Sequence, residues 1–456
     1  MHSILSTFPR VAIFAVALGL CACNGGGVSP VPPGAQSLLR IQHNSSSSKI
    51  QHIVIIVQEN RSFNNLFYGF PGAKTQTYGY NTSGQKITLQ PVGLETTWDI
   101  LHDFGDFVAA CNGTGSLPGT NCQMNGFDNE YWGCGHRYEP GCPNSNPPYS
   151  YVPRTETKPY FYLGKHYVLA DQMYASNVDA SSFISHQYII AGQASSAVNY
   201  PSSSWGCEGG SGDKVGTLTS TRQYGSDIPM CWNNNTLGAE MDGAGLSWAY
   251  YASTVNGDGG IWSAYQNIAP IYNGADWKND VISPQTNFFS DVSNGKLRDL
   301  SWITPTCANS DHAGCGSNTG PSWVASLVNA IGESQYWNNT AIFIMWDDYG
   351  GWYDPEAPAM LDYDGLGMRI PMLVVSAYAK KGHVSHTHYE HGSILKFVEE
   401  TFGLAALSAS DTRATAPDDA FNFNKPPRKF ETVPAVHGID YFLHQQAPDH
   451  RLPDND

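Results

Sequence analysis

Residues 53–63 read IVIIVQENRSF, and this stretch runs five apolar residues directly into a glutamate, an asparagine and an arginine. A short β-branched run without polar alternation predicts a strand that is covered on both faces. In an open α/β sheet, ligands collect at the carboxyl ends of the strands. The stretch therefore predicts a buried strand that places Glu59 and Asn60 at the mouth of a site.

The same pattern recurs further along the chain. Apolar runs flanked by turn residues lie at residues 300–303, 341–346 and 372–376. Residues 321–332 and 393–402 instead carry apolar side chains at helical spacing. Buried strands that alternate with helices predict an α/β fold, here a three-layer sandwich around a largely parallel central sheet.

Length and composition indicate how the rest of the chain is organised. Of the 456 residues, 41% are hydrophobic and 46 are glycine, which is typical of a globular protein with many turns. Stretches rich in glycine, asparagine and aromatic residues, at about residues 70–165 and 200–290, are predicted to be long loop insertions. No internal repeat or second core signature is evident, so residues 49–456 are predicted to form a single domain.

The net charge restricts the class of partner. A formal charge of -16 argues against nucleic acid, because phosphate backbones are bound by clustered lysines and arginines that the sequence does not display. An acidic protein can still bind a phosphate group when a metal ion supplies the positive charge.

The N-terminal residues 1–23 have the pattern of an export signal, in which Arg10 precedes an apolar run that is too short to span a bilayer. Leu20-Cys21-Ala22-Cys23 resembles a bacterial lipobox, which would make Cys23 the lipidated first residue of the mature protein. Ordinary secretion with cleavage nearby is the alternative. Residues 24–48 have the composition of a flexible tether, so we expect an exported protein, either an envelope lipoprotein or a secreted one.

Eight cysteines remain after the signal segment, an even number that favours disulfides in an exported chain. None belongs to a C-x-x-C pair, which argues against a zinc ribbon. Pairing between neighbours would staple four local loops, although the sequence alone leaves the connectivity open. The neighbouring pairs are Cys111 with Cys122, Cys134 with Cys142, Cys207 with Cys231, and Cys307 with Cys315.

Two adjacent carboxylates, Asp347 and Asp348, follow the apolar run at 341–346, as Glu59 and Asn60 follow the first strand. Adjacent carboxylates without a nearby lysine or arginine repel each other unless a cation neutralises them. The two pairs together therefore predict a site for one divalent metal ion. The alternative is that Asp347 and Asp348 start a glycine-rich turn and that Glu59 and Asn60 cap a helix. Oxygen ligands favour Mg, Mn or Ca, and nearby histidines keep Zn or Fe open.

Several hydroxyls and histidines are further candidates for site residues. Ser181, Ser182 and Ser185 precede His186 at the expected start of a helix, where backbone N–H groups attract a phosphate; N-capping is the simpler alternative. The histidine-rich stretch KKGHVSHTHYEHGS has the composition of a solvated loop, and its four histidines cannot all serve one site. These four are His383, His386, His388 and His391, and the isolated candidates are His102 and the pair Asp311-His312.

The motifs QENRSFNNLFYGFPGA, WDDYGGWYDP, GMRIPMLVVSAYAKKGHVSH and YEHGSILKFVEE resemble the bacterial phosphoesterase family of phospholipases C and AcpA-type acid phosphatases. The resemblance spans about residues 50–402 and implies an alkaline-phosphatase-like fold for the catalytic domain. It implies metal ligands, a nucleophile with a competitor, and histidines around the phosphate. In this sequence they are Glu59, Asn60, Asp347, Asp348 and Ser182 for the metal, Ser182 (or Ser185) as nucleophile, and His102, Asp311-His312 and His386 or His391 in the pocket.

The sequence departs from the family pattern at three places. Asn64 replaces the aspartate of ENRSFD, Pro355 stands where relatives often have a histidine, and SFISH replaces the T-x-P-N-R segment. The last difference makes the nucleophile less certain than the acidic ligands. We expect a metal-dependent phosphoric ester hydrolase that acts on a small phosphate ester or a phospholipid.

A phosphomonoesterase is favoured because the chain stops about fifty residues after its last motif, whereas related phospholipases C often carry extra C-terminal domains. The first alternative is a phospholipase C, for which aromatic residues such as Trp248 to Tyr251 would form a choline-binding or lipid-facing rim. The second is a non-catalytic envelope lipoprotein that binds phosphorylated ligands.

Overall fold

The computed structural model describes residues 49–133, 146–201, 206–253 and 260–446, all of which belong to one compact unit. The expected signal peptide (1–23) and tether (24–48), together with Cys134 and Cys142, lie outside the described residues. Within the described part of the chain, no helix has the length and apolar character needed to cross a membrane.

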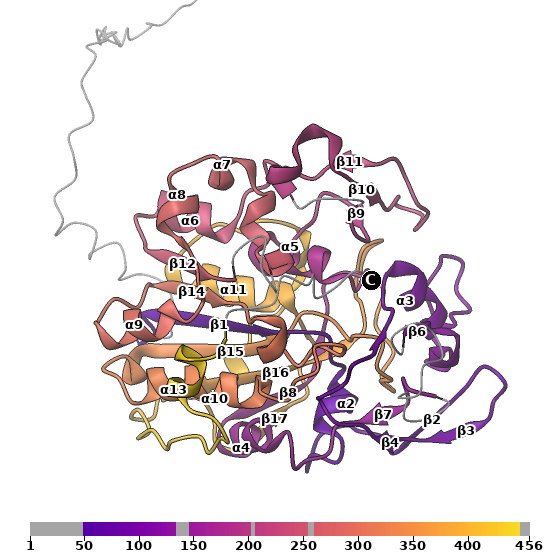
Figure 1. Cartoon of the computed structure of the whole chain (residues 1–456), viewed down its shortest axis with the longest axis horizontal. Helices are drawn as coiled ribbons and strands as arrows, with labels where there is room; N and C mark the ends of the chain where they lie inside the picture. The colour runs from indigo at the N-terminus through magenta and orange to yellow at the C-terminus, as the bar shows by residue number, and fades with distance from the viewer. Residues whose placement is uncertain (1–48, 134–145, 202–205, 254–259, 447–456) are drawn as a thin grey trace, which may run out of the picture. The chain divides into compact units, whose positions relative to one another are not determined.

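A nine-stranded sheet forms the centre of the unit (Figure 1). Neighbouring strands run parallel except at β16, which is antiparallel to both of its neighbours, so the prediction of a largely parallel α/β sheet is confirmed. In spatial order the strands are β13 (Val281–Ile282), β12 (Trp248–Tyr251), β14 (Leu300–Ile303), β1 (His52–Gln58), β15 (Thr340–Trp346), β16 (Arg369–Ser376), β8 (Val168–Tyr174) and β17 (His383–Ser385), with β18 (Tyr389–Glu390) also paired to β8.

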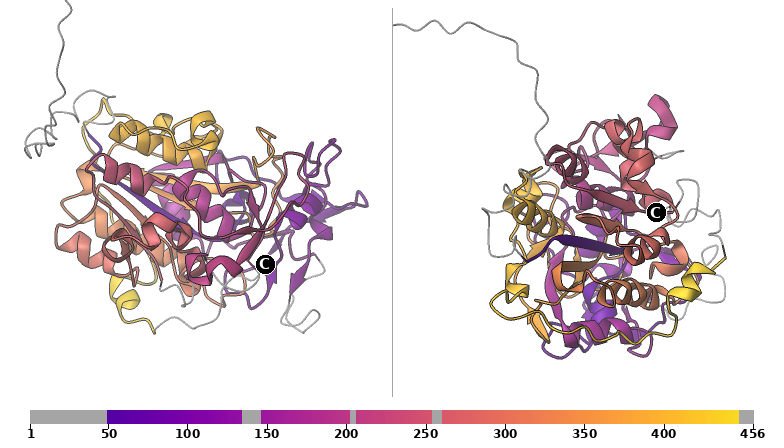
Figure 2. Two further views of the ribbon diagram at one scale, coloured as in Figure 1. Left: turned by 90° about the horizontal axis from the view of Figure 1, so that it is seen from above. Right: turned by 90° about the vertical axis from the view of Figure 1, so that its left-hand side faces the viewer.

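Helices cover both faces of this sheet, as the three-layer prediction requires (Figure 2). One layer is formed by helices that contact one another around α10, and the other by helices that contact α11. The first comprises α4 (Lys158–His166), α9 (Asn287–Ser293), α10 (Gly320–Gly332) and α13 (Ile439–Leu443), and the second α5 (Ser182–Ala191), α11 (His391–Phe402) and α12 (Ala409–Arg413). Because the sheet is covered on both sides, β15 and β16 are buried at every residue.

The pairing of β1 with β15 positions the site. The two strands are parallel and in register from His52 opposite Thr340 to Gln58 opposite Trp346. Glu59 and Asp347 therefore leave the centre of the sheet side by side. Each fully buried valine, leucine or isoleucine in these strands contributes roughly 1.5–3 kcal/mol, so the site rests on two strands that are held by extensive apolar burial.

Two sequence-based expectations about the insertions need correction. The stretch at 200–290 was expected to consist of loops, yet it supplies β12 and β13 to the central sheet. Trp248 to Tyr251 form β12 and are completely buried, which overturns their assignment to an aromatic rim. The segment reads as a loop because its aromatic residues stand among glycines and asparagines, whereas tertiary packing decides its conformation.

Shorter elements complete the described part of the chain. The helices are α2 (Phe63–Phe67), α3 (Phe104–Cys111), α6 (Leu237–Gly243), α7 (Ala269–Tyr272) and α8 (Asp276–Asn279). The strands form four small sheets: β2 (Tyr78–Tyr80) with β3 (Lys86–Thr88), β4 (Gln90–Pro91) with β7 (Ser150–Tyr151), β5 (Asp99–Ile100) with β6 (Trp132–Gly133), and β10 (Lys214–Thr217) between β9 (Ala197–Val198) and β11 (Ile228–Pro229).

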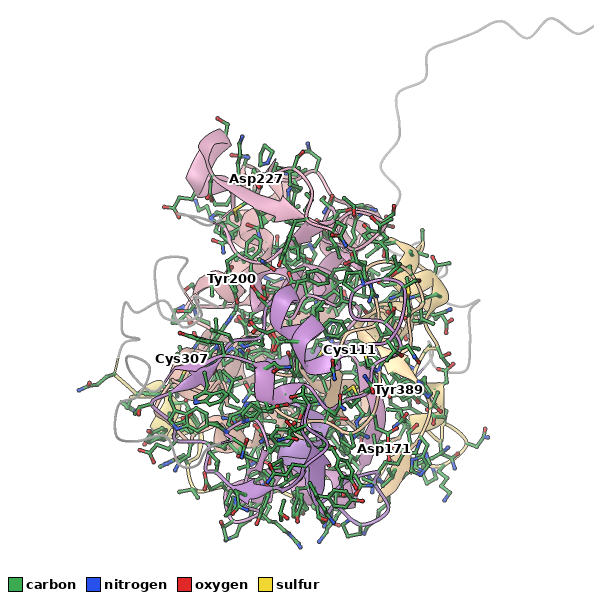
Figure 3. All side chains as sticks on the ribbon, turned by 90° about the vertical axis from the view of Figure 1, so that its right-hand side faces the viewer. Cys111, Asp171, Tyr200, Asp227, Cys307 and Tyr389 are labelled. Atoms are coloured by element: carbon green, nitrogen blue, oxygen red, sulfur yellow. A yellow bond between two sulfur atoms is a disulfide. The ribbon has the colours of Figure 1, made fainter. Side chains whose placement is uncertain are left out.

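Three disulfides close local loops in the described residues, and each joins neighbouring cysteines as expected. They link Cys111 to Cys122, Cys207 to Cys231 and Cys307 to Cys315; Cys111 and Cys307 are labelled in Figure 3. The first two pairs lie in the insertions and the third closes a loop after β14, so each restrains the backbone locally.

Candidate active site

Asn60 is the residue around which the candidate site is built. It adopts a left-handed backbone conformation, with φ of 58°, which asparagine tolerates better than most residues. Its N–H donates to Asp347 Oδ1 at 2.9 Å, and its side-chain oxygen accepts a hydrogen bond from Ser182 Oγ at 3.2 Å. Its amide nitrogen lies 2.8 Å from His102 Nε2. Through its backbone and its side chain, this one buried asparagine connects the ends of two strands with a serine and a histidine.

The turn after β15 fits tightly against Asn60. Gly350 has φ of 59°, and a Cβ built there would lie 2.1 Å from the backbone oxygen of Asn60. The N–H of Gly350 donates to Asp348 Oδ1 at 2.7 Å. Asp348 therefore does begin a glycine-rich turn, as the alternative interpretation held, whereas Asp347 binds the N–H of Asn60. Glu59 and Asn60 do not cap a helix, because Ser62 caps α2.

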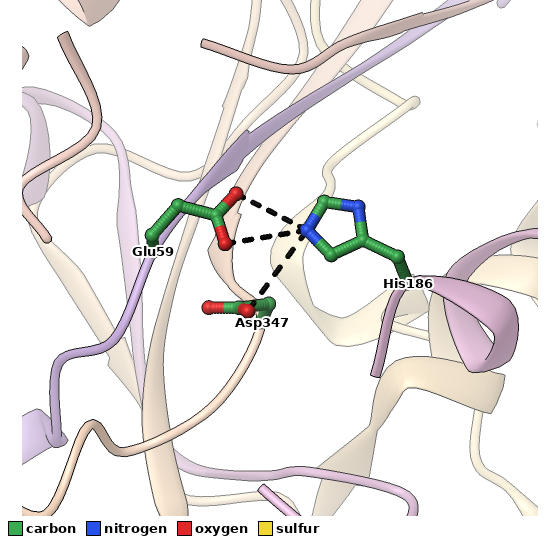
Figure 4. Close-up of side chains that lie close together, drawn as sticks. All are labelled: Glu59, His186 and Asp347. Atoms are coloured by element: carbon green, nitrogen blue, oxygen red, sulfur yellow. Dashed lines mark hydrogen bonds and ion pairs between the residues drawn. The ribbon is translucent and has the colours of Figure 1, made fainter. Parts of the chain in front are cut away.

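Three side chains from three separate elements converge beside Asn60 (Figure 4). His186 Nε2 lies 3.1 and 3.3 Å from the two carboxylate oxygens of Glu59, and 3.9 Å from Asp347 Oδ2. One ligand atom from each of the three residues lies within 4.8 Å of the others, and all three residues are buried. This cluster of Glu59, His186 and Asp347 is hereafter the acid–imidazole cluster.

The chemistry of the acid–imidazole cluster fits a divalent cation. Asp347 is fully buried, and its Oδ2 has no hydrogen-bond partner in the described part of the chain. Two buried carboxylates this close are costly without a compensating positive charge. A cation that accepts carboxylate oxygens and an imidazole nitrogen would supply it. Asn60 and Asp348 are the sequence neighbours of Glu59 and Asp347, and Asp348 is oriented toward the Gly350 turn and His102.

Helix α5 brings Ser182 to this cluster and directs Ser185 elsewhere. Ser182 is the first residue of α5, whereas Ser185 Oγ accepts a hydrogen bond from Asn177 at 3.3 Å. Ser181 occupies the N-cap position, but its hydroxyl donates to Asp179 at 2.9 Å instead of capping the helix. Of the three serines, Ser182 is the one whose hydroxyl contacts Asn60.

Two further candidates, His102 and His312, lie on the opposite side of Asn60. His102 Nδ1 lies 2.5 Å from the carbonyl oxygen of Ile100, and its Nε2 is 3.9 Å from Asp348 Oδ1. The carbonyl can only accept a hydrogen bond, so Nδ1 carries a proton and Nε2 faces Asn60. The ring of His312 lies 6.4 Å from that of His102, and its Nδ1 lies 3.5 Å from Asp99 Oδ2. Both histidines are completely buried on their side chains.

Asp311, the neighbour of His312, has a structural role in the described fold. It accepts a hydrogen bond from the hydroxyl of Tyr160 at 2.6 Å, and its backbone oxygen accepts one from Arg61 at 2.7 Å. Burial raises the pKa of Asp311 to about 6. Burial also lowers the pKa of Arg61 to about 10, and this guanidinium stacks on Trp352 at 4.6 Å.

His386 and His391, the two candidates from the histidine-rich stretch, lie apart in the structure. His391 begins α11, is buried, and is electrostatically coupled to Asp347 and His186. Burial lowers its pKa to about 4 against the opposing effect of Asp347, so it is neutral at physiological pH. His386 lies apart: its side chain is 54% exposed and its Nδ1 contacts Asp171 of β8 at 2.8 Å. The structure therefore brings His391, and not His386, toward the acid–imidazole cluster.

His186 is the site residue that sequence reasoning missed. In the sequence it only follows three candidate serines at the expected start of a helix, and nothing in its apolar surroundings indicates a carboxylate partner. Its Nδ1 lies 3.4 Å from the hydroxyl of Tyr250, which donates to the carbonyl of Trp262 at 2.7 Å. The spacing of four residues on a helix was a usable signal, because it places Ser182 and His186 on one face.

Comparison with known proteins gives a family and a set of relatives. Residues 50–405 match the model of the Phosphoesterase family. A non-hemolytic phospholipase C of Burkholderia pseudomallei is 24% identical over 89% of this chain and 64% of its own length. Phospholipase C B of Mycobacterium tuberculosis is 26% identical over 83% of this chain and 78% of its own length.

Comparison with solved structures finds a protein in the alkaline phosphatase superfamily from Vibrio parahaemolyticus. Its TM-score is 0.35 at 12% identity, over 82% of this chain and 72% of that one. The PsFucS1 sulfatase from Pseudoalteromonas sp. has a TM-score of 0.41 at 11% identity, over 88% of this chain and 78% of that one. The match over residues 50–405 shows that the chain belongs to the phosphoesterase family, the class of phosphoric ester hydrolases that its motifs resemble.

Proposed function

We propose that this protein hydrolyses phosphoric esters, with Ser182 as the nucleophile and a divalent metal ion as cofactor. The observation that carries the proposal is the hydrogen bond from Ser182 Oγ to Asn60, whose own N–H is bound to Asp347 of the acid–imidazole cluster. A hydroxyl at the start of α5 is also well placed to meet a phosphate, because backbone N–H groups point toward it.

Glu59, Asn60, Asp347, Asp348 and His186 are the residues that would hold the ion, with Ser182 beside them. When bound, a divalent ion lowers the pKa of a nearby hydroxyl and polarises a phosphate oxygen. A nitrogen donor among oxygen donors favours Zn, Mn or Fe over Mg or Ca, the remaining ions of the expected set.

The protein's own residues account for the remaining chemistry. Ser182 Oγ attacks phosphorus and the alcohol departs, leaving a phosphoserine that water then hydrolyses. His102, held by the Ile100 carbonyl, keeps the Asn60 amide in the orientation that receives the Ser182 hydroxyl. His391 is neutral and so can accept a proton, and His312 completes the set of histidines that we assign to proton transfer.

A phosphomonoester is our first candidate for the substrate. Ser182 and the acid–imidazole cluster are fully buried, so the reacting group must enter a confined space, which suits a small terminal phosphate. Phospholipase C activity is the second candidate, favoured by the names of the relatives. Either activity is compatible with an exported protein, for which the three disulfides provide support. We retain the lipid anchor at Cys23 as part of the proposal.

Hydrolysis of p-nitrophenyl phosphate and of p-nitrophenylphosphorylcholine by the full chain, over a range of pH and metal ions, tests the substrate class. We expect the monoester to be cleaved with the higher kcat/KM; preferential cleavage of the phosphorylcholine ester would identify a phospholipase C. A protein that contains no stoichiometric metal and cleaves neither ester would be a non-catalytic binding protein, contrary to the proposal.

The metal ligands are tested by His186→Gln, with His386→Gln as the matched control on the exposed loop. We expect His186→Gln to weaken metal binding by at least about tenfold, because even the loss of an outer-shell partner that only orients a ligand costs about 10–100-fold in affinity. Binding is measured by titration of the metal-depleted protein, and in the cobalt-substituted protein the visible absorption should change in the first variant and not in the second. Equal affinities of the two variants would remove His186 from the ligand set.

A further inference from the structure

Two short basic segments that are far apart in sequence lie against each other at the end of β16. Residues 377–381 read AYAKK and residues 422–430 read NFNKPPRKF, and neither segment contains an acidic residue. They are joined by backbone hydrogen bonds of 2.9 Å from Asn422 to Tyr378 and from Arg428 to Ala377. Each segment alone is short, and the fold joins the two into one basic cluster.

A cavity of about 400 Å³ lies between these segments. Its charged lining consists of Lys380, Lys381, Lys425 and Arg428, and no carboxylate contributes to it; we call it the cationic cavity. Its volume falls within the range of about 300–1,000 Å³ that is typical of small-molecule sites. Four positive charges around one cavity are unusual in a chain whose formal net charge is -16.

These four cations are not neutralised by the described part of the protein. None of them forms an ion pair with a described carboxylate, whereas Arg413 binds Glu390 with two nitrogens, at 2.8 and 2.7 Å. Glu431, three residues after Arg428, pairs with His166 at 3.4 Å instead. An uncompensated group of like charges favours the binding of an anion.

Arg428 is the fixed member of the group. Its Nη1 donates to the carbonyl oxygen of His166 at 3.0 Å, and its guanidinium lies 4.8 Å from the centre of the Tyr167 ring. Two more donors, Nε and Nη2, are buried without a hydrogen-bond partner in the described residues. The guanidinium, which lines the cavity, therefore retains hydrogen-bonding capacity.

The cationic cavity and the candidate active site lie at opposite ends of the central strands β15 and β16. Ser376, at the end of β16, pairs with Ala341 near the start of β15, while Asp347 follows the end of β15. Six residues of strand separate the two ends by roughly 20 Å. Lys49 lies at the same end of the strands as the cavity. Its ammonium group is 5.1 Å from the ring of Tyr378, a residue that lines the cavity.

We propose that the cationic cavity is a second, non-catalytic anion site that binds a phosphate group. A phosphate carries up to two negative charges and several acceptor oxygens, which matches three mobile ammonium groups around one fixed guanidinium. A carboxylate offers a single charge. The phosphate can belong to a free phosphate compound or to the headgroup of an anionic lipid, and the two sources share this chemistry. The inference is independent of the reaction at Ser182.

The test uses the full chain and titration calorimetry with inorganic phosphate at low ionic strength. The variant Lys380→Ala/Lys381→Ala/Lys425→Ala removes three cations from the cavity, and Lys214→Ala/Lys278→Ala/Lys296→Ala removes three exposed lysines from elsewhere. Both are made on an Asp347→Asn background, so that phosphate at the candidate active site is not counted. We expect affinity to fall at least about tenfold in the first variant and to be unchanged in the second.

Vesicles distinguish the source of the phosphate. We expect binding to vesicles that contain phosphatidic acid, whose headgroup is a phosphomonoester, but not to phosphatidylcholine vesicles, if the ligand is a lipid headgroup, and phosphate binding alone if it is a free compound. In either case the cavity variant should lose the binding and the control variant should keep it. The proposal is overturned if the parent protein binds neither phosphate nor anionic vesicles, or if the two triple variants bind equally.

Discussion

At the scale of single residues, Ser182 and Ser185 offer a direct comparison, because they lie on the same helix with different partners. Ser182 Oγ contacts Asn60, whereas Ser185 Oγ contacts Asn177. We expect Ser182→Ala to reduce kcat for a chromogenic phosphate ester by at least about 10³-fold, as loss of a nucleophile does in other hydrolases. Ser185→Ala should retain kcat within about tenfold.

Metal content is the control for this pair of variants. Both proteins should bind the same amount of metal, since the buried carboxylates remain in place. Comparable activity of Ser182→Ala and the parent protein would contradict the assignment of the nucleophile, and a large loss in Ser185→Ala alone would transfer that role to Ser185.

The residues of the candidate site show how much of it the sequence predicts. Glu59 and Asp347 were identified because each follows a buried strand, and parallel strands carry their ends to a common edge. His186 was not identified as a ligand candidate, because its approach to Glu59 depends on how α5 packs over the sheet. The separation of His391 from His386 depends in the same way on packing, because α11 begins at His391 and leaves His386 in the loop before it.

At the scale of elements, strands with uninterrupted apolar runs were predicted within a few residues of their observed bounds. The strands at β12 and β8 were not, since aromatic, polar and acidic residues interrupt them. The direction of β16 was also beyond the sequence, because a run such as MLVVS is equally compatible with either orientation. The layer arrangement followed from alternation of element types, whereas strand order required long-range contacts.

The junction of α11 and α12 is sensitive to pH. Burial, together with a hydrogen bond to Asp411, raises the pKa of Glu399 to about 9, well above that of an unfolded chain. The folded state therefore holds a proton that the unfolded state releases above about pH 4.5, and this contribution to stability is lost as the pH rises through 9. We expect Glu399→Gln, which is neutral at all pH values, to be more stable than the parent at pH 8.5.

The gain should be on the order of 1 kcal/mol at pH 8.5 and should vanish near pH 5, where the parent side chain is also neutral. Denaturant unfolding at the two pH values measures it. Glu95→Gln, at an exposed position, is the matched control and should leave the pH dependence of unfolding unchanged. A gain of equal size at both pH values would show that the substitution acts through packing and not through the proton.

At the scale of the whole molecule, the acid–imidazole cluster joins segments that are more than a hundred residues apart in sequence. Glu59 follows β1, His186 lies in α5 and Asp347 follows β15, so an ion bound between them ties the sheet to one of its helical layers. A ligand that binds only the folded state stabilises it by about 2.7 kcal/mol at a hundred times its Kd. We therefore expect a chelator to lower Tm by several degrees, with saturating metal restoring it.

Two substitutions separate this effect from a general response to the chelator. Asp347→Asn removes a buried carboxylate that we propose as a ligand, so its Tm should be insensitive to both chelator and metal. Asp227→Asn removes an exposed carboxylate from the loop labelled in Figure 3 and should respond as the parent does. Differential scanning calorimetry measures all three proteins. If Asp347→Asn kept the full metal-dependent shift, the stabilising ion would lie elsewhere, and the link between the cluster and the stability of the fold would be wrong.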